Sequence, residues 1–145
     1  MNRVHTDGAC RGNPGPGGWA WARGVDLFAS GAEAHTTNQR MEIRAVIEAL
    51  REMPDGDLEI VSDSSYVVKC FHERWHAGWL RRGWKNSQGK PVANQDLWRP
   101  LLELALSDER RVTFSWVKGH SGDVMNDFVD ALATAAADTQ RGRHS

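Results

Sequence analysis

The stretch RVHTDG, residues 3–8, and the stretch LEIVSDS, residues 58–64, both contain a short β-type run that ends in an aspartate between small, turn-prone residues. These aspartates are Asp7 and Asp63. A carboxylate at the end of a strand is a poor core residue, because burying its charge costs several kcal/mol unless another group compensates. If adjacent strands bring the two carboxylates together, a hard divalent cation with oxygen ligands is the simplest compensation. The two stretches therefore predict a metal-dependent site.

Hydrophobic periodicity predicts an α/β fold around one mixed sheet. The expected strands are 3–9, 19–23, 26–35, 58–62 and 111–117, and the expected helices are 37–53, 64–76, 94–107 and 123–138. The first three strands follow one another through short turns, which favours an antiparallel meander. Helices link the later strands, which favours parallel crossovers. The glycine- and proline-rich segment 10–18 is typical of a loop.

Length and composition restrict the class of protein. The 145 residues fit a single domain, 1–145, with a polar tail at 139–145 that we expect to be frayed. No apolar run reaches the length of a membrane span, and the first five residues form no apolar signal segment. Cys10 and Cys70 are too few for a disulfide framework and lack the spacing of zinc ligands. We expect a cytoplasmic monomer that does not bind a membrane.

Charge is unevenly distributed along the chain. The formal net charge is −1, yet the segment 69–90 holds six basic residues and one acid, a local net charge of +5. In this segment Trp75, Trp79 and Trp84 alternate with cations. Trp75 and Trp79 are four residues apart on one helix face, a spacing more often found in a core. Because apolar neighbours are few and cations are dense, we favour a surface that binds a nucleic-acid backbone.

Glu42 is a third candidate acid. On a helical wheel it lies about 40° from Val46, at the edge of the apolar stripe. Taken singly, each acid has an equally good structural explanation. Glu42 could keep its carboxylate in water, Asp7 could stabilise a turn, and Asp63 could cap a helix. The predicted sheet, however, brings all three toward one place, and three acids that converge favour a functional site.

The last predicted helix, 123–138, is expected to supply a fourth acid. Asp123, Asp127 and Asp130 all lie on the face opposite its apolar stripe, so periodicity does not choose among them. His120 stands between two glycines in the preceding loop, which leaves its ring free to move and makes it a candidate functional residue. The alternative for His120 is an ordinary surface histidine, and spacing alone favours that alternative.

Taken together, these features resemble type 1 ribonuclease H from Val4 to about Ala137. The motifs that carry the resemblance are TDG at 6–8 with GNPG at 12–15, TNQRME at 37–42, SDS at 62–64, RGWK at 82–85, and VKGHSG at 117–122 followed by Asn126 and Asp130. Each motif is weak alone, but their combination in this order is highly specific. The resemblance implies a ribonuclease H-like α/β fold, with three antiparallel strands followed by parallel strands in a five-stranded mixed sheet flanked by helices.

The resemblance also implies an activity. An enzyme of this family hydrolyses the RNA strand of RNA–DNA hybrids by a two-metal-ion mechanism and leaves 5′-phosphate and 3′-hydroxyl ends. The implied cofactor is Mg²⁺, two ions with substrate, with Mn²⁺ as a possible substitute. By the match, Asp7, Glu42, Asp63 and Asp130 are the catalytic, metal-binding carboxylates. His120 matches a loop histidine that assists proton movement or product departure.

The implied contacts with the hybrid lie in two groups. Four residues match positions that contact the minor groove of the hybrid: Cys10, Asn13, Asn38 and Gln39. Thr37 matches a position in the phosphate pocket for the DNA strand. The basic protrusion, about 75–92, supplies Trp75, Trp79, Arg81, Arg82, Trp84 and Lys85. Two positions depart from the family pattern, because Ser65 stands where several relatives carry a longer amide and Asp127 replaces a more usual glutamate.

Two alternatives stay open. The first is another metal-dependent nuclease of the same fold, such as a resolvase or integrase, which would lack the tryptophan-rich insert and the glycine–histidine loop. The second is a non-catalytic module that binds hybrids or double-stranded RNA. Such a module would gain nothing from clustered acids that repel phosphates.

Overall fold

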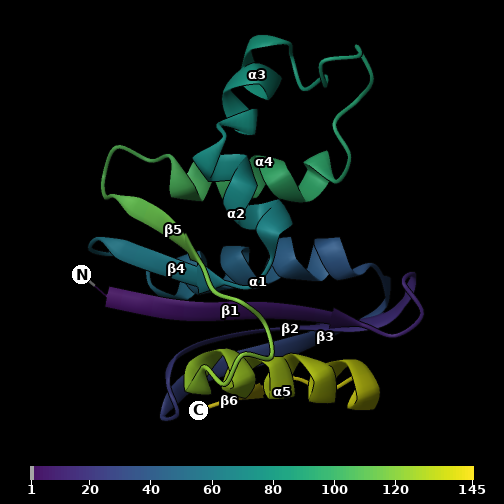
Figure 1. The fold of residues 1–145 in the computed structure, drawn as a ribbon, viewed down its shortest axis with the longest axis vertical. Coiled ribbons are helices and arrows are strands. Elements are labelled where there is room, and N and C mark those ends of the chain that lie inside the picture. The colour runs from purple at the N-terminus through teal and green to yellow at the C-terminus, as the bar shows by residue number, and fades with distance from the viewer. Residues whose placement is uncertain (1) are drawn as a thin grey trace.

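One mixed β-sheet organises the chain, which the computed structural model describes from residue 2 to residue 145 (Figure 1). Met1 of the expected domain lies outside the described residues. The sheet order is β5-β4-β1-β2-β3-β6. The strands are β1 (Asn2–Cys10), β2 (Gly15–Gly24), β3 (Leu27–Thr36), β4 (Leu58–Ser62), β5 (Val112–Trp116) and β6 (Arg143–His144). Strands β1 to β3 pair antiparallel, whereas β4 pairs parallel with both β1 and β5. The predicted mixed sheet of five strands is confirmed, and β6 extends it.

Helices cover both faces of the sheet. They are α1 (Asn38–Glu52), α2 (Ser65–His72), α3 (Trp75–Arg81), α4 (Gln95–Ala105) and α5 (Val124–Thr139). Figure 1 shows α5 on one face and α1, α2 and α4 on the other, with α3 farthest from the sheet. Among residues 2–145, no helix combines the length and the apolar character needed to cross a membrane.

A separate hydrophobic core lies on each face. The larger core contains Trp98 and Ile47, both almost fully buried, between α1, α4 and the sheet. The smaller core joins Ala20 and Ala22 of β2 to α5. Since successive strand residues point to opposite faces, Trp21 enters the larger core while its alanine neighbours enter the smaller one.

Strand β2 begins earlier than expected, at Gly15 rather than Trp19. Gly17 pairs with Cys10 and Gly18 pairs with Ala9, so half of the expected loop belongs to the sheet. The glycines permit close packing there: a Cβ on Gly18 would lie 2.4 Å from the carbonyl oxygen of Ala133 in α5. Composition indicated a loop because it does not distinguish a glycine needed for a turn from one needed for a close approach.

The helix expected at 64–76 is two helices. Helix α2 ends at His72, and Arg74 takes the left-handed conformation with φ of 56° before α3 begins. Ser64 caps α2, since its hydroxyl accepts the backbone N–H of Val67. Arg74 is neither glycine nor asparagine, so no local residue signal marked the break.

The expectation of a frayed tail is wrong for residues 143–144. They form β6 on the outer edge of β3, where Arg143 N–H donates to Ser30 Oγ at 3.0 Å. The N–H of Ser145 donates to the carbonyl oxygen of Phe28 at 3.0 Å. The edge of β3 offers unpaired backbone groups, and a polar tail satisfies them as well as an apolar one does.

Candidate active site

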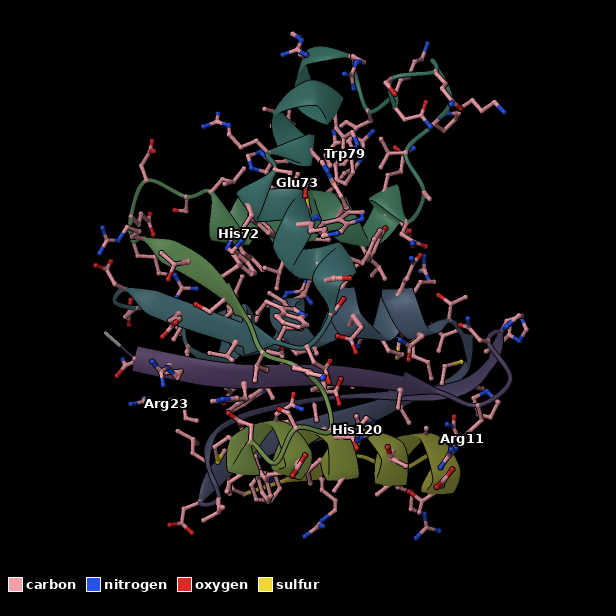
Figure 2. The ribbon with its side chains drawn as sticks, viewed as in Figure 1. Arg11, Arg23, His72, Glu73, Trp79 and His120 are labelled. Carbon is pink, nitrogen blue, oxygen red and sulfur yellow. The ribbon has the colours of Figure 1, made fainter. Side chains whose placement is uncertain are left out.

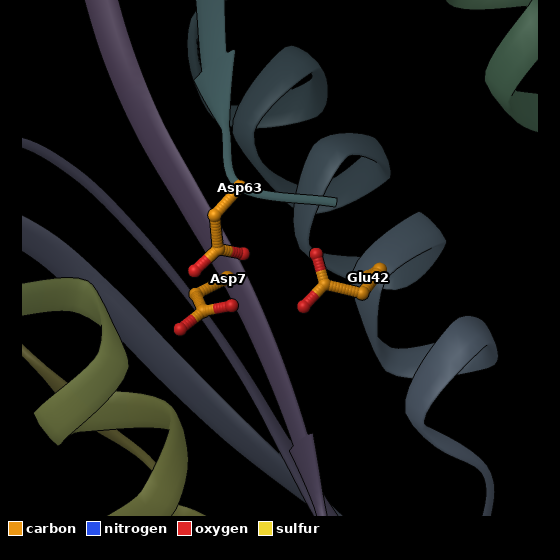
Figure 3. Close-up of side chains that lie close together, drawn as sticks. All are labelled: Asp7, Glu42 and Asp63. Carbon is orange, nitrogen blue, oxygen red and sulfur yellow. The ribbon is translucent and has the colours of Figure 1, made fainter. Parts of the chain in front are cut away.

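Asp7 and Asp63 meet because their strands are parallel neighbours. The register places Thr6 of β1 opposite Ser62 of β4, so the aspartates follow at the same end of the sheet. Asp7 is buried, with 3 % of its surface exposed, and Asp63 is half-buried. Figure 3 shows the two carboxyl groups turned toward each other, with Glu42 facing them from α1.

Helix α1 delivers Glu42 against β1. Its start is fixed by Thr37, whose Oγ1 accepts the N–H of Arg40 at 3.2 Å. Glu42 then lies on the buried face with 4 % exposure, and its Oε1 accepts the backbone N–H of Gly8 at 2.7 Å. The same N–H lies 2.9 Å from Asp7 Oδ1. A Cβ on Gly8 would lie 2.4 Å from the backbone nitrogen of Glu42, so only glycine permits this approach of helix to strand.

Asp7, Glu42 and Asp63 form one compact carboxylate cluster. Each contributes an oxygen that lies within 4.8 Å of the oxygens of the other two. Burial raises the pKa of Asp7, and the charge of Glu42 raises it further. Burial likewise raises the pKa of Glu42, and the N–H of Gly8 offsets part of that rise. Three acids held together against burial and mutual repulsion are suited to a bound cation.

One orphaned atom supports the fit of a cation. Glu42 Oε2 is buried and accepts no hydrogen bond from any residue in the described range 2–145. A buried carboxylate oxygen without a donor costs about 1–3 kcal/mol or more, so such atoms are rare without a function. A hard divalent ion with oxygen ligands would satisfy this atom and offset the repulsion in the cluster.

Asp130 lies half-buried on α5, outside the compact cluster of three. Burial raises the pKa of Asp63, and the negative charge of Asp130 raises it further, so the two carboxyls are close. Asp127 is exposed, and Asp123 caps α5 by accepting the N–H of Asn126 at 2.8 Å. The structure thus separates three aspartates that periodicity left equivalent, and it places Asp130 nearest the cluster.

His120 lies in the loop between β5 and α5, close to Asp63. It is exposed, its φ is 55°, and its charge partly lowers the pKa of Asp63. The adjacent Gly119 keeps the loop close, because a Cβ there would lie 2.8 Å from Asp63 Oδ2. Figure 2 shows His120 between the sheet and α5.

The predicted hybrid-binding residues gather around the start of α1 and the loop before β2. They are Cys10, Asn13, Thr37, Asn38 and Gln39. Asn13 Oδ1 accepts the backbone N–H of Asn38 at 2.8 Å, which ties the loop to the helix. Asn38 and Gln39 are exposed beside the buried Glu42, whereas the thiol of Cys10 lies 3.3 Å from the carbonyl oxygen of Thr36. This surface adjoins the carboxylate cluster.

The tryptophans of the protrusion pack inward, contrary to the interpretation we favoured from sequence. Trp79 lies 5.4 Å from Trp98 and 6.0 Å from Trp84 between ring centroids, and all three belong to or flank the larger core. Figure 2 shows Trp79 at the junction of α3 with the body. The exposed groups are the cations Arg81, Arg82 and Lys85. The spacing of the tryptophans therefore indicated packing rather than substrate binding. The composition of the segment could not show this, because the packing partner Trp98 lies outside it.

Sequence reasoning missed two parts of the site. Gly8 was treated as a turn residue, although its N–H holds Glu42 and its missing side chain admits α1. Asn126 was noted only as part of a motif, yet it is 1 % exposed and its side chain partly offsets the rise that burial causes in the pKa of Asp63. The available signal was its spacing of four residues from Asp130, which places both on one face of α5.

Comparisons with known proteins agree with this geometry. The RNase H family model matches residues 2–138. The chain is 47 % identical to a ribonuclease H of Erythrobacter litoralis, over 94 % of this chain and 96 % of the relative. It is 48 % identical to a ribonuclease H of Thermus thermophilus, over 94 % and 84 % of the two chains. A crystal structure of a type 1 RNase H with the type 2 active-site motif superposes with a TM-score of 0.82 and 30 % identity, over 99 % of this chain and 76 % of that one. With the fold, the carboxylate cluster and the sequence in agreement, the chain belongs to the ribonuclease H family of enzymes.

Proposed function

We propose that this chain is an endonuclease that hydrolyses the RNA strand of RNA–DNA hybrids and leaves 5′-phosphate and 3′-hydroxyl ends. The observation that carries the proposal is the cluster of Asp7, Glu42 and Asp63, with ligand oxygens within 4.8 Å of one another. Membership of the family supports the reaction class. The chain would act as one domain, as a monomer and in the cytoplasm.

Asp7, Glu42, Asp63 and Asp130 would hold two Mg²⁺ ions, with Mn²⁺ as a possible substitute. The buried and unsatisfied Oε2 of Glu42 fits this role, as do the raised pKa values of Asp7, Glu42 and Asp63. Bound divalent ions neutralise the phosphodiester, promote deprotonation of a water and stabilise the leaving 3′ oxygen. No side chain of the protein needs to act as a nucleophile.

Each residue of the site has a separate proposed task. Asp7 is buried, and the negative charges of both Glu42 and Asp63 raise its pKa further, so it would help to hold both ions. Glu42, held by the Gly8 N–H, would also accept a hydrogen bond from the 2′-hydroxyl, the group that distinguishes RNA from DNA. Asp130 would help to hold the ion near the attacking water. His120, exposed and next to Asp63, would move a proton or help the product leave.

The hybrid would lie across the start of α1 and reach the protrusion. Asn13, Asn38, Gln39 and Cys10 would face its minor groove, and Thr37 a phosphate of the DNA strand. The exposed cations of the protrusion would contact the backbone. Trp75, Trp79 and Trp84 would hold these cations in position by packing, since their rings face one another and Trp98.

A cleavage assay tests the proposal. Labelled RNA is supplied as an RNA–DNA hybrid, as duplex RNA and as a single strand, each with Mg²⁺ or with a chelator. We expect cleavage of the hybrid alone and only with metal. Cleavage of a four-way junction in preference to the hybrid would instead identify a resolvase-like enzyme, and tight binding of hybrid without cleavage would identify a binding module.

A matched pair of variants tests the site itself. Glu42→Gln should abolish cleavage while the protein stays folded, because the change removes a repelling charge and keeps the shape of the side chain. Glu52→Gln, on the exposed end of the same helix, should cleave at the wild-type rate. A folded Glu42→Gln protein with near-normal turnover would refute the assignment.

A further inference from the structure

A groove lies beside Asp63, between α2 and the edge strand β5. It encloses about 460 Å³ and is lined by Ser65, Val68, Lys69, His72, Glu73 and Trp116. Figure 2 labels His72 and Glu73 where α2 ends, near β5. The groove begins at Ser65, two residues after Asp63, and none of its lining residues belongs to the carboxylate cluster. Its position therefore makes it a continuation of the candidate active site along the surface.

Trp116 forms an aromatic wall of this groove. Its side chain is 54 % exposed, one of the few large apolar groups so open among residues 2–145. The indole is nonetheless anchored, because Nε1 donates to the backbone carbonyl oxygen of Asp63 at 3.2 Å. An anchored and exposed indole is a suitable platform on which a nucleic-acid base can stack.

The polar groups of the groove suit one nucleotide. Lys69 is exposed and offers a cation for a phosphate. The acid Glu73 is already engaged, since its Oε1 accepts Trp75 Nε1 at 3.1 Å. His72 Nε2 lies 2.6 Å from the carbonyl oxygen of Phe114, which fixes the ring and leaves Nδ1 as an acceptor in the neutral form. The groove thus combines an aromatic ring for stacking, from Trp116, with the cation Lys69 and the polar edge of His72.

We propose that this groove binds a single-stranded nucleotide of the RNA strand immediately beyond the hybrid, with its base on Trp116 and its phosphate near Lys69. This inference rests on the proposed function and extends it to the flanks of the substrate. Continuity with Asp63 favours a segment of the substrate strand as the occupant. A stable protein partner would bury on the order of 1,000 Å² or more, far beyond this groove.

Kinetics on extended hybrids provide the first test. A blunt hybrid is compared with hybrids that carry a short single-stranded extension of RNA at the 5′ side, of RNA at the 3′ side, or of DNA. Stacking of one base predicts that one of the two RNA extensions lowers KM about fivefold or more, while the others leave it unchanged. Equal KM values for all four substrates, or an effect of the DNA extension alone, would overturn the proposal.

Variants locate the effect. The ratio of KM for blunt and extended hybrids, taken within each variant, cancels any change in the chemical step. Trp116→Ala should reduce the ratio to one, Trp116→Phe should keep most of it because the ring remains, and Lys69→Ala should lower it. Arg51→Ala, an exposed cation on α1 outside both the groove and the protrusion, is the control. A Trp116→Ala protein that cleaves more slowly but keeps the full ratio would show that Trp116 acts only by holding Asp63.

A crosslinking measurement separates this inference from the proposed activity. Hybrid with 5-iodouridine in the RNA extension is irradiated with the protein in chelator, where no cleavage is expected, and the attached peptide is identified. We expect attachment at Trp116 and its loss in Trp116→Ala. Attachment elsewhere, or none, rejects the groove. If no hybrid is cleaved in any condition, the proposed function fails, while the crosslink still decides what the groove binds.

Discussion

The backbone N–H of Gly8 donates to Oε1 of Glu42 at 2.7 Å, so the strand that carries the most buried aspartate also holds the glutamate that opposes it. The bond needs α1 close to β1, and only the absence of a side chain on Gly8 permits that distance. Site geometry and helix packing therefore depend on the same residue.

Replacing this glycine should damage both stability and activity. In Gly8→Ala the new Cβ would lie 2.4 Å from the Glu42 nitrogen, so α1 must shift away from β1. Overpacking of this kind costs about 1–3 kcal/mol, and we expect the free energy of unfolding in urea to fall by that amount. Hybrid cleavage should fall more steeply, because Glu42 moves. Gly24→Ala is the control, since a Cβ there meets no atom within 4 Å; equal behaviour of the two variants would argue against the role of Gly8.

Stability without metal should fall as pH rises. Folding raises the pKa values of Asp7, Glu42 and Asp63 above their ordinary values near 4, with burial as the main cause. The folded state then binds more protons than the unfolded state, so the stabilising contribution is complete below about pH 4 and is lost as pH rises through the folded pKa values. Denaturation in chelator from pH 4 to pH 8 measures this slope.

The same titration has two controls. Asp7→Asn should flatten the slope, because it removes the most strongly shifted group. Mg²⁺ at a hundredfold excess over its Kd should raise stability at neutral pH by about 2.7 kcal/mol. A stability profile that is flat in chelator and unaffected by Mg²⁺ would remove the physical basis of the metal site.

Elements whose signals lie in neighbouring residues were predictable from the sequence. Elements that depend on contacts with residues far along the chain were not. The strand that contains Asp7 and the strand that precedes Asp63 were found because strand pattern and turn residues are local signals. The break at Arg74 was missed because it follows from the packing of α3 against Trp98, a residue far along the chain. Similarly, β6 exists because β3 has an open edge, which segment 143–145 cannot reveal by itself.

The choice among the acids of α5 shows a second limit. The apolar stripe that periodicity gives for the helix 123–138 passes through large residues, including Met125 and Phe128, which are only half-buried in the structure. The buried face is instead rotated toward the small residues Ala133 and Ala137, whose backbone lies against Gly18 of β2. That rotation brings Asp130 toward the site. Alanine contributes little to a hydrophobic pattern, although it marks the closest contacts.

Two residues of the protrusion, Arg81 and Trp79, should show separate effects on substrate binding and on stability. Arg81→Ala removes an exposed cation, so KM should rise several-fold with a small change in kcat, and the salt dependence of binding should weaken by about one unit of slope. Trp79→Ala instead removes a half-buried ring and should lower the free energy of unfolding by about 2 kcal/mol. KM at several salt concentrations and urea unfolding measure the two effects. Arg51→Ala, an exposed cation on α1, should change neither quantity.

Asp130 and Asp127 offer the sharpest comparison in the site, since they lie one turn apart on α5 and differ in surroundings. Asp130 is half-buried and its charge reaches Asp63, whereas Asp127 is exposed. Asp130→Asn should therefore reduce kcat about a hundredfold or more and weaken Mg²⁺ binding measured by calorimetry. Asp127→Asn should leave both unchanged and cost only a few tenths of a kcal/mol, through the lost interaction with the start of the helix. Because both changes remove one charge from the same helix, a similar loss in the two variants would mean that net charge governs activity, whereas a loss confined to Asp130→Asn would place Asp130 with the metal-binding carboxylates.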